Sequence, residues 1–198
     1  DAMSKGIQFL FKKNKIDVLQ GFGKVLPGKK VEVKKEDGTT ENYEANHIIL
    51  ATGARSRELP NLKQDGKKII GYREAMTLDK QPESMLVVGS GAIGSEFAYF
   101  YHTMGTQVTL VEFMPNIVPV EDEEVSKQLE RSFKKNKMKV MTSSEVLSVE
   151  TSGKKCKVQI KTKKGEETVE VDIVLSAVGV STNLEGIGLE ETGIKHEK

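Results

Sequence analysis

The sequence predicts an α/β protein with one nearly complete unit built on a parallel sheet, and part of a second unit of the same type. Three observations support this fold class: buried strands alternate with amphipathic helices, a run of strands and turns replaces a further crossover helix, and a segment repeats along the chain. Alternating strands and helices are typical of parallel sheets, because parallel strands need a crossover connection. A length of 198 residues allows one ordinary domain and a fraction of another.

The alternating stretch occupies the middle of the chain. An apolar run at Met85–Val88 predicts a buried strand, and Gln107–Glu112 predicts a second one. Ala92–Met104 has apolar residues at every fourth position, which predicts a helix that stops at Gly105. A second helix is expected over Glu121–Asn136, with acidic residues first and lysines last, as the helix dipole favours. A solvated surface helix explains this charge order, so we assign it no function.

Strands and turns follow where a plain doubly wound domain has another helix. The expected strands are separated by dipeptides that are typical of turns. In order, they are Glu145–Glu150, a turn at Ser152-Gly153, Cys156–Lys161, a turn at Lys164-Gly165, and Thr168–Val171. The sequence therefore predicts a β-meander crossover that leads into the last strand of the sheet, at Ile173–Ser176.

Phe11–Lys15 has the same five letters as Phe133–Lys137, at an offset of 122 residues. Five residues could match by chance in a lysine-rich chain, but the same order of expected elements follows both copies. Both copies continue into a β-type run, then strands and turns, and then an apolar strand that leads to Ala-x-Gly. In the first copy these elements are Ile16–Leu19, Val31–Val33, a turn at Asp37-Gly38 and Ile48–Gly53. In the second copy they are Met138–Met141, the meander and Ile173–Gly179. We interpret this as an internal duplication, with only the end of the first unit present after a helix at Ala2–Lys13.

Composition excludes several classes of function. Thirty Lys and Arg against 29 Asp and Glu give a net charge of +1, which argues against a domain that grips nucleic acid or an acidic membrane. No apolar run approaches the ~18 residues of a spanning helix, and the first residues lack a secretory signal. A single cysteine, Cys156, excludes an internal disulfide and a Cys-rich zinc site, and we expect it to be a small packing residue.

Gly89–Gly94 has the pattern G-x-G-x-x-G between an expected strand and an expected helix. Each glycine has a physical reason: Gly89 allows the tight turn, Gly91 lets a pyrophosphate approach the backbone, and Gly94 lets helix and strand pack closely. Glu112 ends the next strand, 21 residues after Gly91, where an acid can accept hydrogen bonds from ribose hydroxyls. This context predicts a Rossmann-like dinucleotide-binding domain, and the alternative is a tight turn without a ligand. The residues Phe113–Asn116 offer no cation for a 2′-phosphate, which favours NAD over NADP.

Together these features resemble the pyridine nucleotide–disulfide oxidoreductases, in the branch that oxidises dihydrolipoamide. The resemblance covers essentially the whole chain. It rests on Gly21–Lys24, Ala51–Ala54, Val87–Glu96 with Glu112, Ile117–Pro119, Ser144–Val146, Ala177–Gly179 and Asn183–Glu190. It implies that residues 1–60 are the C-terminal part of an FAD-binding domain, 61–180 an NAD-binding domain, and 181–198 the start of a return segment, with Pro60 and Lys63–Lys68 at the first join.

The resemblance also implies which residues contact the two cofactors. The NAD set is Gly89, Ser90, Gly91, Ala92, Ile93, Gly94, Ser95, Glu96, Glu112, Val146 and Gly179; the FAD set is Gly23, Thr52, Gly53 and Ala54. Glu96 resembles an acid that supports the flavin, although a helix acid near the positive end of the dipole is an equal explanation. Val180–Asn183 replaces the family's Arg-x-Pro-Asn, which puts an arginine contact to the nicotinamide in doubt.

The implied parent is a homodimeric NAD- and FAD-dependent enzyme that belongs to 2-oxoacid dehydrogenase complexes, in a bacterial cytoplasm or a mitochondrial matrix. Its redox-active cysteine pair is absent from this chain, which has one cysteine. We therefore expect no catalytic residue here and no lipoamide turnover by these residues alone, and we give His47, His102 and His196 no catalytic role. The alternatives are an NADH oxidase or another disulfide reductase of the same architecture, and a non-catalytic NAD-binding module.

Overall fold

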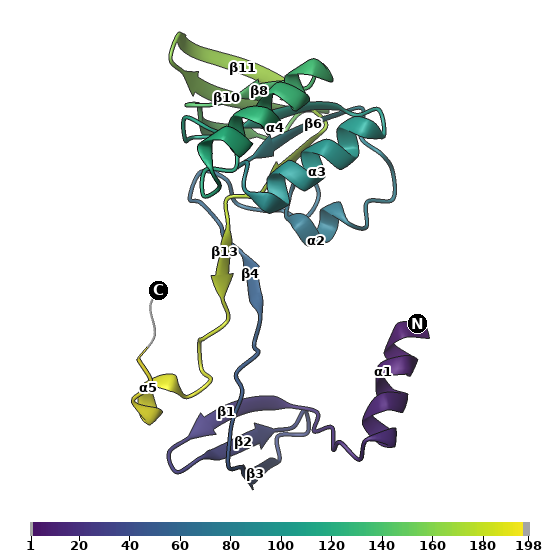
Figure 1. Cartoon of the computed structure of the whole chain (residues 1–198), viewed down its shortest axis with the longest axis vertical. Coiled ribbons are helices and arrows are strands. Elements are labelled where there is room, and N and C mark those ends of the chain that lie inside the picture. The colour runs from purple at the N-terminus through teal and green to yellow at the C-terminus, as the bar shows by residue number, and fades with distance from the viewer. Residues whose placement is uncertain (1, 196–198) are drawn as a thin grey trace. The chain divides into compact units, whose positions relative to one another are not determined.

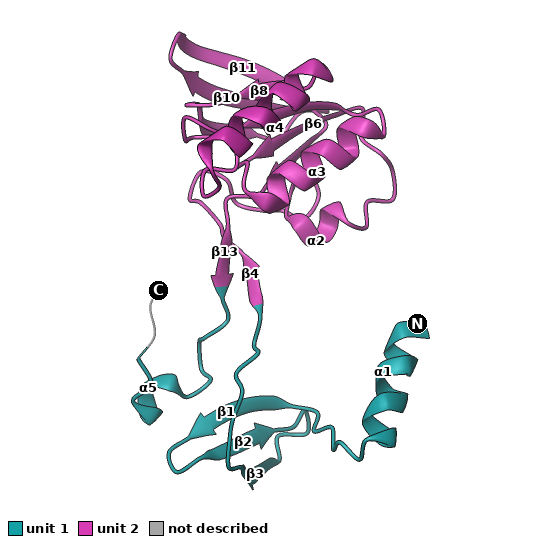
Figure 2. Cartoon of the chain, viewed as in Figure 1, with its two compact units in different colours: residues 1–53, 182–198 teal, residues 54–181 magenta. Residues whose placement is uncertain are grey.

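The computed structural model describes residues 2–195, so His196 lies outside the described part of the chain. The chain forms two compact units: unit 1 comprises residues 1–53 and 182–198, and unit 2 comprises residues 54–181 (Figure 2). The expected joins lay after residues 60 and 180, whereas the observed divisions follow Gly53 and Ser181. The segment between 54 and 60 belongs to unit 2 because Ala54–Ser56 forms a strand, β4, that pairs with β13 (Val180–Thr182).

Unit 2 is built on a five-stranded parallel sheet, which confirms the expected Rossmann-like α/β fold (Figure 1). Its strand order is β5-β12-β6-β7-β8, so β12, the last of these five strands along the chain, lies between two that precede it. The strands are β5 (Ile69–Ile70), β12 (Ile173–Ser176), β6 (Ser84–Val88), β7 (Gln107–Val111) and β8 (Lys139–Met141).

The two faces of the sheet are covered by different structures. Met85 and Val87 point into a cluster with residues of the helices α3 (Ala92–Thr103) and α4 (Glu123–Lys135). Leu86 and Val88 point to the opposite face, because successive side chains alternate along a strand. All four are almost fully buried, as expected for a central parallel strand covered on both sides.

The second face is covered by the expected meander. Its strands are β9 (Glu145–Glu150), β10 (Cys156–Thr162) and β11 (Gly165–Val171), which pair in antiparallel order with β10 in the centre. Cys156, Val158 and Ile160 of β10 are fully buried against the sheet. A short helix, α2 (Tyr72–Ala75), packs near β5 and β12 on the helical side.

Unit 1 contains the helix α1 (Ala2–Lys13), a three-stranded antiparallel sheet and a short helix, α5 (Leu189–Thr192). The sheet has the order β1-β2-β3, from Phe22–Leu26, Lys30–Lys34 and Thr40–Glu44. Two expected strands, Ile16–Leu19 and Ile48–Gly53, do not form. A strand needs a neighbour to accept and donate its backbone hydrogen bonds, and the described strands of unit 1 pair only with one another, which leaves Ile49 91% exposed.

The repeated five residues end two helices in the same way. Lys15 and Lys137 both adopt a left-handed backbone, with φ of 54° and 65°. The Nδ2 atoms of Asn14 and Asn136 each donate to a carbonyl four residues earlier, at 2.9 Å. Ile16 and Met138, the residues after these lysines, donate their N–H groups to the carbonyls of Phe11 and Phe133, at 2.9 and 3.0 Å. The same letters therefore encode the same helix end in both units.

None of the helices among residues 2–195 is long and apolar enough to span a membrane.

Candidate dinucleotide site

The glycine-rich turn connects β6 to α3 at the carboxyl edge of the sheet, where ligands of open α/β sheets bind. Gly89 has φ of 92°, and a Cβ at this position would lie 2.5 Å from the carbonyl oxygen of Ala177. Gly94 faces back onto the turn, and a Cβ there would lie 1.9 Å from the carbonyl oxygen of Gly89. Both positions therefore require glycine for packing, whatever the turn binds.

Gly91 differs from the other two glycines. It is the N-cap of α3, and a Cβ built on it meets no atom within 4 Å. The first N–H groups of a helix have no partner within the helix, and together with the dipole they form a site for anions. Ala92 is exposed and Ile93 is half-buried in this first turn. The turn thus presents open backbone N–H groups to whatever lies in front of Gly91.

Glu112 is 6% exposed and follows β7, beside the turn. Its Oε2 accepts hydrogen bonds from the backbone N–H and the hydroxyl of Ser90, both at 2.7 Å, and its Oε1 accepts one from the N–H of Met114 at 2.8 Å. A carboxylate oxygen has two lone pairs, so Oε2 is saturated and Oε1 has room for one more donor. The structure thus joins the two parts of the sequence motif, the glycine-rich turn and the distant acid.

Ser95 and Val118 also form hydrogen bonds to the turn. The carbonyl of Ser90 accepts hydrogen bonds from the hydroxyl of Ser95 and from the N–H of Val118, both at 2.9 Å. Val118 has φ of 41°, a left-handed conformation that is strained for a β-branched residue. Sequence reasoning gave Val118 no role at this turn, and no sequence pattern indicates that its N–H reaches the carbonyl of Ser90.

The remaining expected NAD residues lie at the same edge. Val146 is 6% exposed at the start of β9, and its carbonyl accepts a hydrogen bond of 2.7 Å from Nδ2 of Asn61. Gly179 has φ of 107°, and its carbonyl accepts from the N–H of Arg57 at 3.0 Å. Glu96 lies on the exposed face of α3, away from the hydrogen bonds that hold the turn.

The four residues expected to contact FAD lie in different elements. Gly23 lies in β1 opposite Val33, and a Cβ there would meet no atom within 4 Å. The carbonyl oxygens of Thr52 and Gly53 accept hydrogen bonds from the side chain and the N–H of Asn183, at 3.1 and 3.0 Å. Ala54 begins β4 in unit 2. The structure thus brings Thr52 and Gly53 to one place and Gly23 to another.

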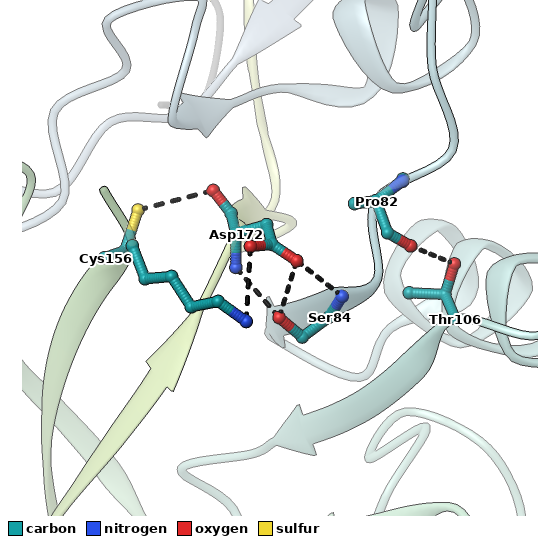
Figure 3. Close-up of polar contacts among 6 residues, drawn as sticks. Pro82, Ser84, Thr106, Cys156 and Asp172 are labelled. Atoms are coloured by element: carbon teal, nitrogen blue, oxygen red, sulfur yellow. Dashed lines mark hydrogen bonds and ion pairs between the residues drawn. The ribbon is translucent and has the colours of Figure 1, made fainter.

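A cluster of polar contacts lies at the opposite edge of the sheet, around Ser84 and Asp172 (Figure 3). Oδ2 of Asp172 accepts hydrogen bonds from the N–H and the hydroxyl of Ser84, both at 2.8 Å, and Nζ of Lys155 lies 3.4 Å from Oδ1. Cys156 is fully buried beside it, and its Sγ lies 3.7 Å from the carbonyl oxygen of Asp172. Burial raises the pKa of the Cys156 thiol, so this cysteine is a packing residue with little thiolate. Among the described residues, no His, Cys, Asp and Glu cluster could hold a metal ion.

The parallel sheet, the glycine-rich turn at a helix N-terminus and the buried acid after the next strand define the Rossmann-like class of dinucleotide-binding folds. The family model of the pyridine nucleotide-disulphide oxidoreductases matches residues 1–198, and the chain belongs to this family.

Relatives with known names cover the whole chain. Dihydrolipoyl dehydrogenase of Rhizobium etli is 41% identical over an aligned stretch of 211 positions, which covers 99% of this chain and 44% of the relative. Dihydrolipoyl dehydrogenase of Chlorobaculum parvum is 43% identical over 196 residues, 98% of this chain and 42% of the relative. The crystal structure of LpdA from Mycobacterium tuberculosis matches all of this chain and 44% of its own, with a TM-score of 0.87 and 30% identity. The chain therefore spans less than half the length of the proteins it matches.

Proposed function

We propose that this chain is the NAD(H)-binding portion of a dihydrolipoyl dehydrogenase. The observation on which the proposal rests is the buried Glu112 carboxylate, fixed by Ser90 beside the N-terminus of α3. The names of the relatives support the same assignment. In the whole protein, FAD and a redox-active cysteine pair pass electrons from dihydrolipoamide to NAD+, and the cysteine pair is not among these 198 residues, which contain only Cys156.

The residues present suit a bound NAD. The pyrophosphate accepts hydrogen bonds from the first N–H groups of α3, because the open space at Gly91 lets it approach the backbone. The free lone pair of Glu112 Oε1 accepts a hydrogen bond from a hydroxyl of the adenosine ribose. Val146 packs near the adenine, and Gly179 lies beside the nicotinamide half of the cofactor. The 2′-phosphate of NADP would meet the Glu112 carboxylate without a compensating cation, so NAD is the preferred form.

The FAD residues also suit their proposed role. Gly53 has φ of 71°, and a Cβ there would meet only Nδ2 of Asn183, at 4.0 Å, so its backbone is open to a ligand. Gly23, Thr52 and Ala54 complete the proposed contacts. FAD, when bound, supplies the two-electron step between the disulfide and NAD, and we propose that Glu96 supports the flavin. The whole protein is proposed to be a homodimer and a component of 2-oxoacid dehydrogenase complexes, in the bacterial cytoplasm or the mitochondrial matrix.

Titration of the chain with NADH and with NADPH, followed by NADH fluorescence or calorimetry, tests the proposal. We expect NADH to bind at least tenfold more tightly than NADPH, and Glu112→Ala to weaken NADH binding by about tenfold, or ~1.4 kcal/mol. Glu150→Ala, an acid at the far end of β9, is the matched control and should leave the affinity unchanged. Equal affinity for the two nucleotides, or an unaffected Glu112→Ala variant, would refute the assignment.

A further inference from the structure

A second polar pocket in unit 2 contains no residue of the glycine-rich turn. It is a cavity of about 520 Å³ between the paired strands β4 and β13 and the short helix α2, whose places Figure 1 shows. We call it the arginine pocket. Arg55 and Ser56 of β4, the next residue Arg57, Arg73 and Glu74 of α2, and Ser181 of β13 line it. All of these residues belong to unit 2, so the pocket is formed within one compact body.

Two guanidinium groups of the pocket have no acidic partner. Arg73 donates to the hydroxyl of Tyr72 at 3.2 Å and to the carbonyl of Ala54 at 3.4 Å, and both acceptors are neutral. Arg57 makes no ion pair with any residue between 2 and 195. A guanidinium offers a planar fork of donors that suits carboxylates and phosphates. The pocket therefore contains two cations with donors to spare.

The two glutamates of the pocket already accept hydrogen bonds from backbone N–H groups. One carboxylate oxygen of Glu74 accepts the N–H of Gly71 at 3.0 Å, and one of Glu58 accepts the N–H of Gln64 at 3.3 Å. Three of the lining residues are arginines and two are glutamates, and each of these glutamates already accepts a backbone N–H. The arrangement thus favours an anion over a cation.

Gly71 lies behind three side chains that line the pocket, those of Ser56, Gln64 and Glu74. A Cβ at this position would lie 2.5 Å from Oε1 of Gln64 and 2.8 Å from Oγ of Ser56, so polar atoms converge on the bare Cα. Nε2 of Gln64 is buried and has no hydrogen-bond partner. A buried donor without a partner costs free energy, which an oxygen atom in the pocket would recover.

We propose that the arginine pocket binds a phosphate dianion, either inorganic phosphate or the terminal group of a phosphate monoester. A tetrahedral anion has oxygens that point in several directions, and the donors here come from β4, β13, α2 and the loop between β4 and β5. The guanidinium groups of Arg57 and Arg73 offset its charge in charge-assisted hydrogen bonds, and the hydroxyls of Ser56 and Ser181 and the Gln64 amide add neutral donors.

Titration of the isotope-labelled chain with inorganic phosphate at constant ionic strength, followed by NMR, tests the proposal. We expect saturable shifts of the Ser56, Arg57, Arg73 and Ser181 signals that persist when NADH is present. Arg57→Ala and Arg73→Ala should each raise the dissociation constant about tenfold. Arg131→Ala, on the exposed part of α4, is the matched control and should change nothing. A parallel titration with glycerol phosphate distinguishes the sources: tighter binding than inorganic phosphate identifies a monoester site, and weaker binding a site for the free ion.

The site does not exist if the shifts grow linearly without saturation, or if they occur at Ala92–Ser95 and NADH abolishes them. The first result is adventitious association, and the second is binding at the N-terminus of α3. Gly71→Ala provides a separate check, because its methyl group displaces the side chains of Ser56 and Gln64, which line the pocket. Its thermal transition shows whether it is folded, and a folded Gly71→Ala or Arg57→Ala variant that binds phosphate as tightly as the parent also refutes the proposal.

Discussion

Ser90 donates two hydrogen bonds of 2.7 Å to the same carboxylate oxygen of Glu112, one from its backbone N–H and one from its hydroxyl. Both residues are buried, so these bonds lie in a medium where charge-assisted hydrogen bonds are strong. The interaction fixes the shape of the turn and at the same time orients the acid proposed to bind the ribose. The turn is therefore shaped before any ligand arrives, which reduces the entropy lost on binding.

Replacing Ser90 by alanine removes the hydroxyl and keeps the backbone donor. We expect Ser90→Ala to lower the free energy of unfolding of unit 2 by about 1.5–3 kcal/mol, the usual contribution of a hydrogen bond to a charged group, and to weaken NADH binding several-fold. Ser152→Ala is the control, because Ser152 makes the same type of bond to Glu150 at 2.8 Å on an exposed surface. Thermal melts and NADH titrations measure both effects. Equal losses in the free energy of unfolding of the two variants would show that burial does not strengthen the hydrogen bond of Ser90.

Substitutions at two glycines of the turn test its packing and its nucleotide binding separately. Gly94→Ala places a methyl group 1.9 Å from the carbonyl oxygen of Gly89, so we expect a loss of several kcal/mol in the free energy of unfolding. Gly91→Ala meets no atom and should melt near the parent temperature, yet bind NADH at least tenfold more weakly because the methyl group blocks the pyrophosphate. If Gly91→Ala bound NADH normally, the pyrophosphate would not lie against this residue.

The sequence predicted the parts of the site that depend on local pattern. The strand, the glycine-rich turn and the helix of β6 and α3 follow from hydrophobic periodicity and glycine spacing, and the place of Glu112 follows from the length of one βαβ unit. The hydrogen bond from Val118 to Ser90 depends on the path of the segment after β7. No periodicity encodes such a path, so the role of Val118 could be found only in the structure.

The errors in unit 1 have a similar cause. Ile48, Ile49 and Leu50 have the composition of a buried parallel strand, but they form no strand in the structure. The equivalent apolar residues of the second copy, in β12, lie between β5 and β6, which supply hydrogen bonds on both sides. Strand formation requires such neighbours as well as apolar residues. The repeat therefore predicted the helix end correctly, because that is local, and failed for the strand, which is not.

Asp172 makes the free energy of unfolding of unit 2 depend on pH. Burial raises the pKa of Asp172, but the hydrogen bonds from Ser84 and the nearby Lys155 outweigh it and hold the pKa below the usual range. A depressed pKa stabilises the folded state above pH ~4, and this contribution is lost as the pH falls through the folded pKa. Asp172→Asn should cost about 1 kcal/mol at pH 7 and less below pH ~3.

Thermal melts of the parent and of Asp172→Asn across this pH range measure the difference. Asp79→Asn, at an exposed position in the loop after α2, is the control and should follow the parent at each pH. If the difference in stability between the parent and Asp172→Asn stays constant down to low pH, the carboxylate charge does not contribute to the stability of unit 2.

Lys137 lies just after the C-terminus of α4 in a left-handed conformation with φ of 65°, which costs a residue with a Cβ about 1–2 kcal/mol. Glycine avoids this cost and loses about 0.5–1 kcal/mol through its more flexible unfolded chain. We therefore expect Lys137→Gly to raise the free energy of unfolding of unit 2 by about 0.5–1 kcal/mol. Lys135→Gly, at the last helical residue, should instead lower it by up to ~1 kcal/mol. Denaturant titration measures both, and two changes of the same sign would contradict the proposed role of the left-handed residue.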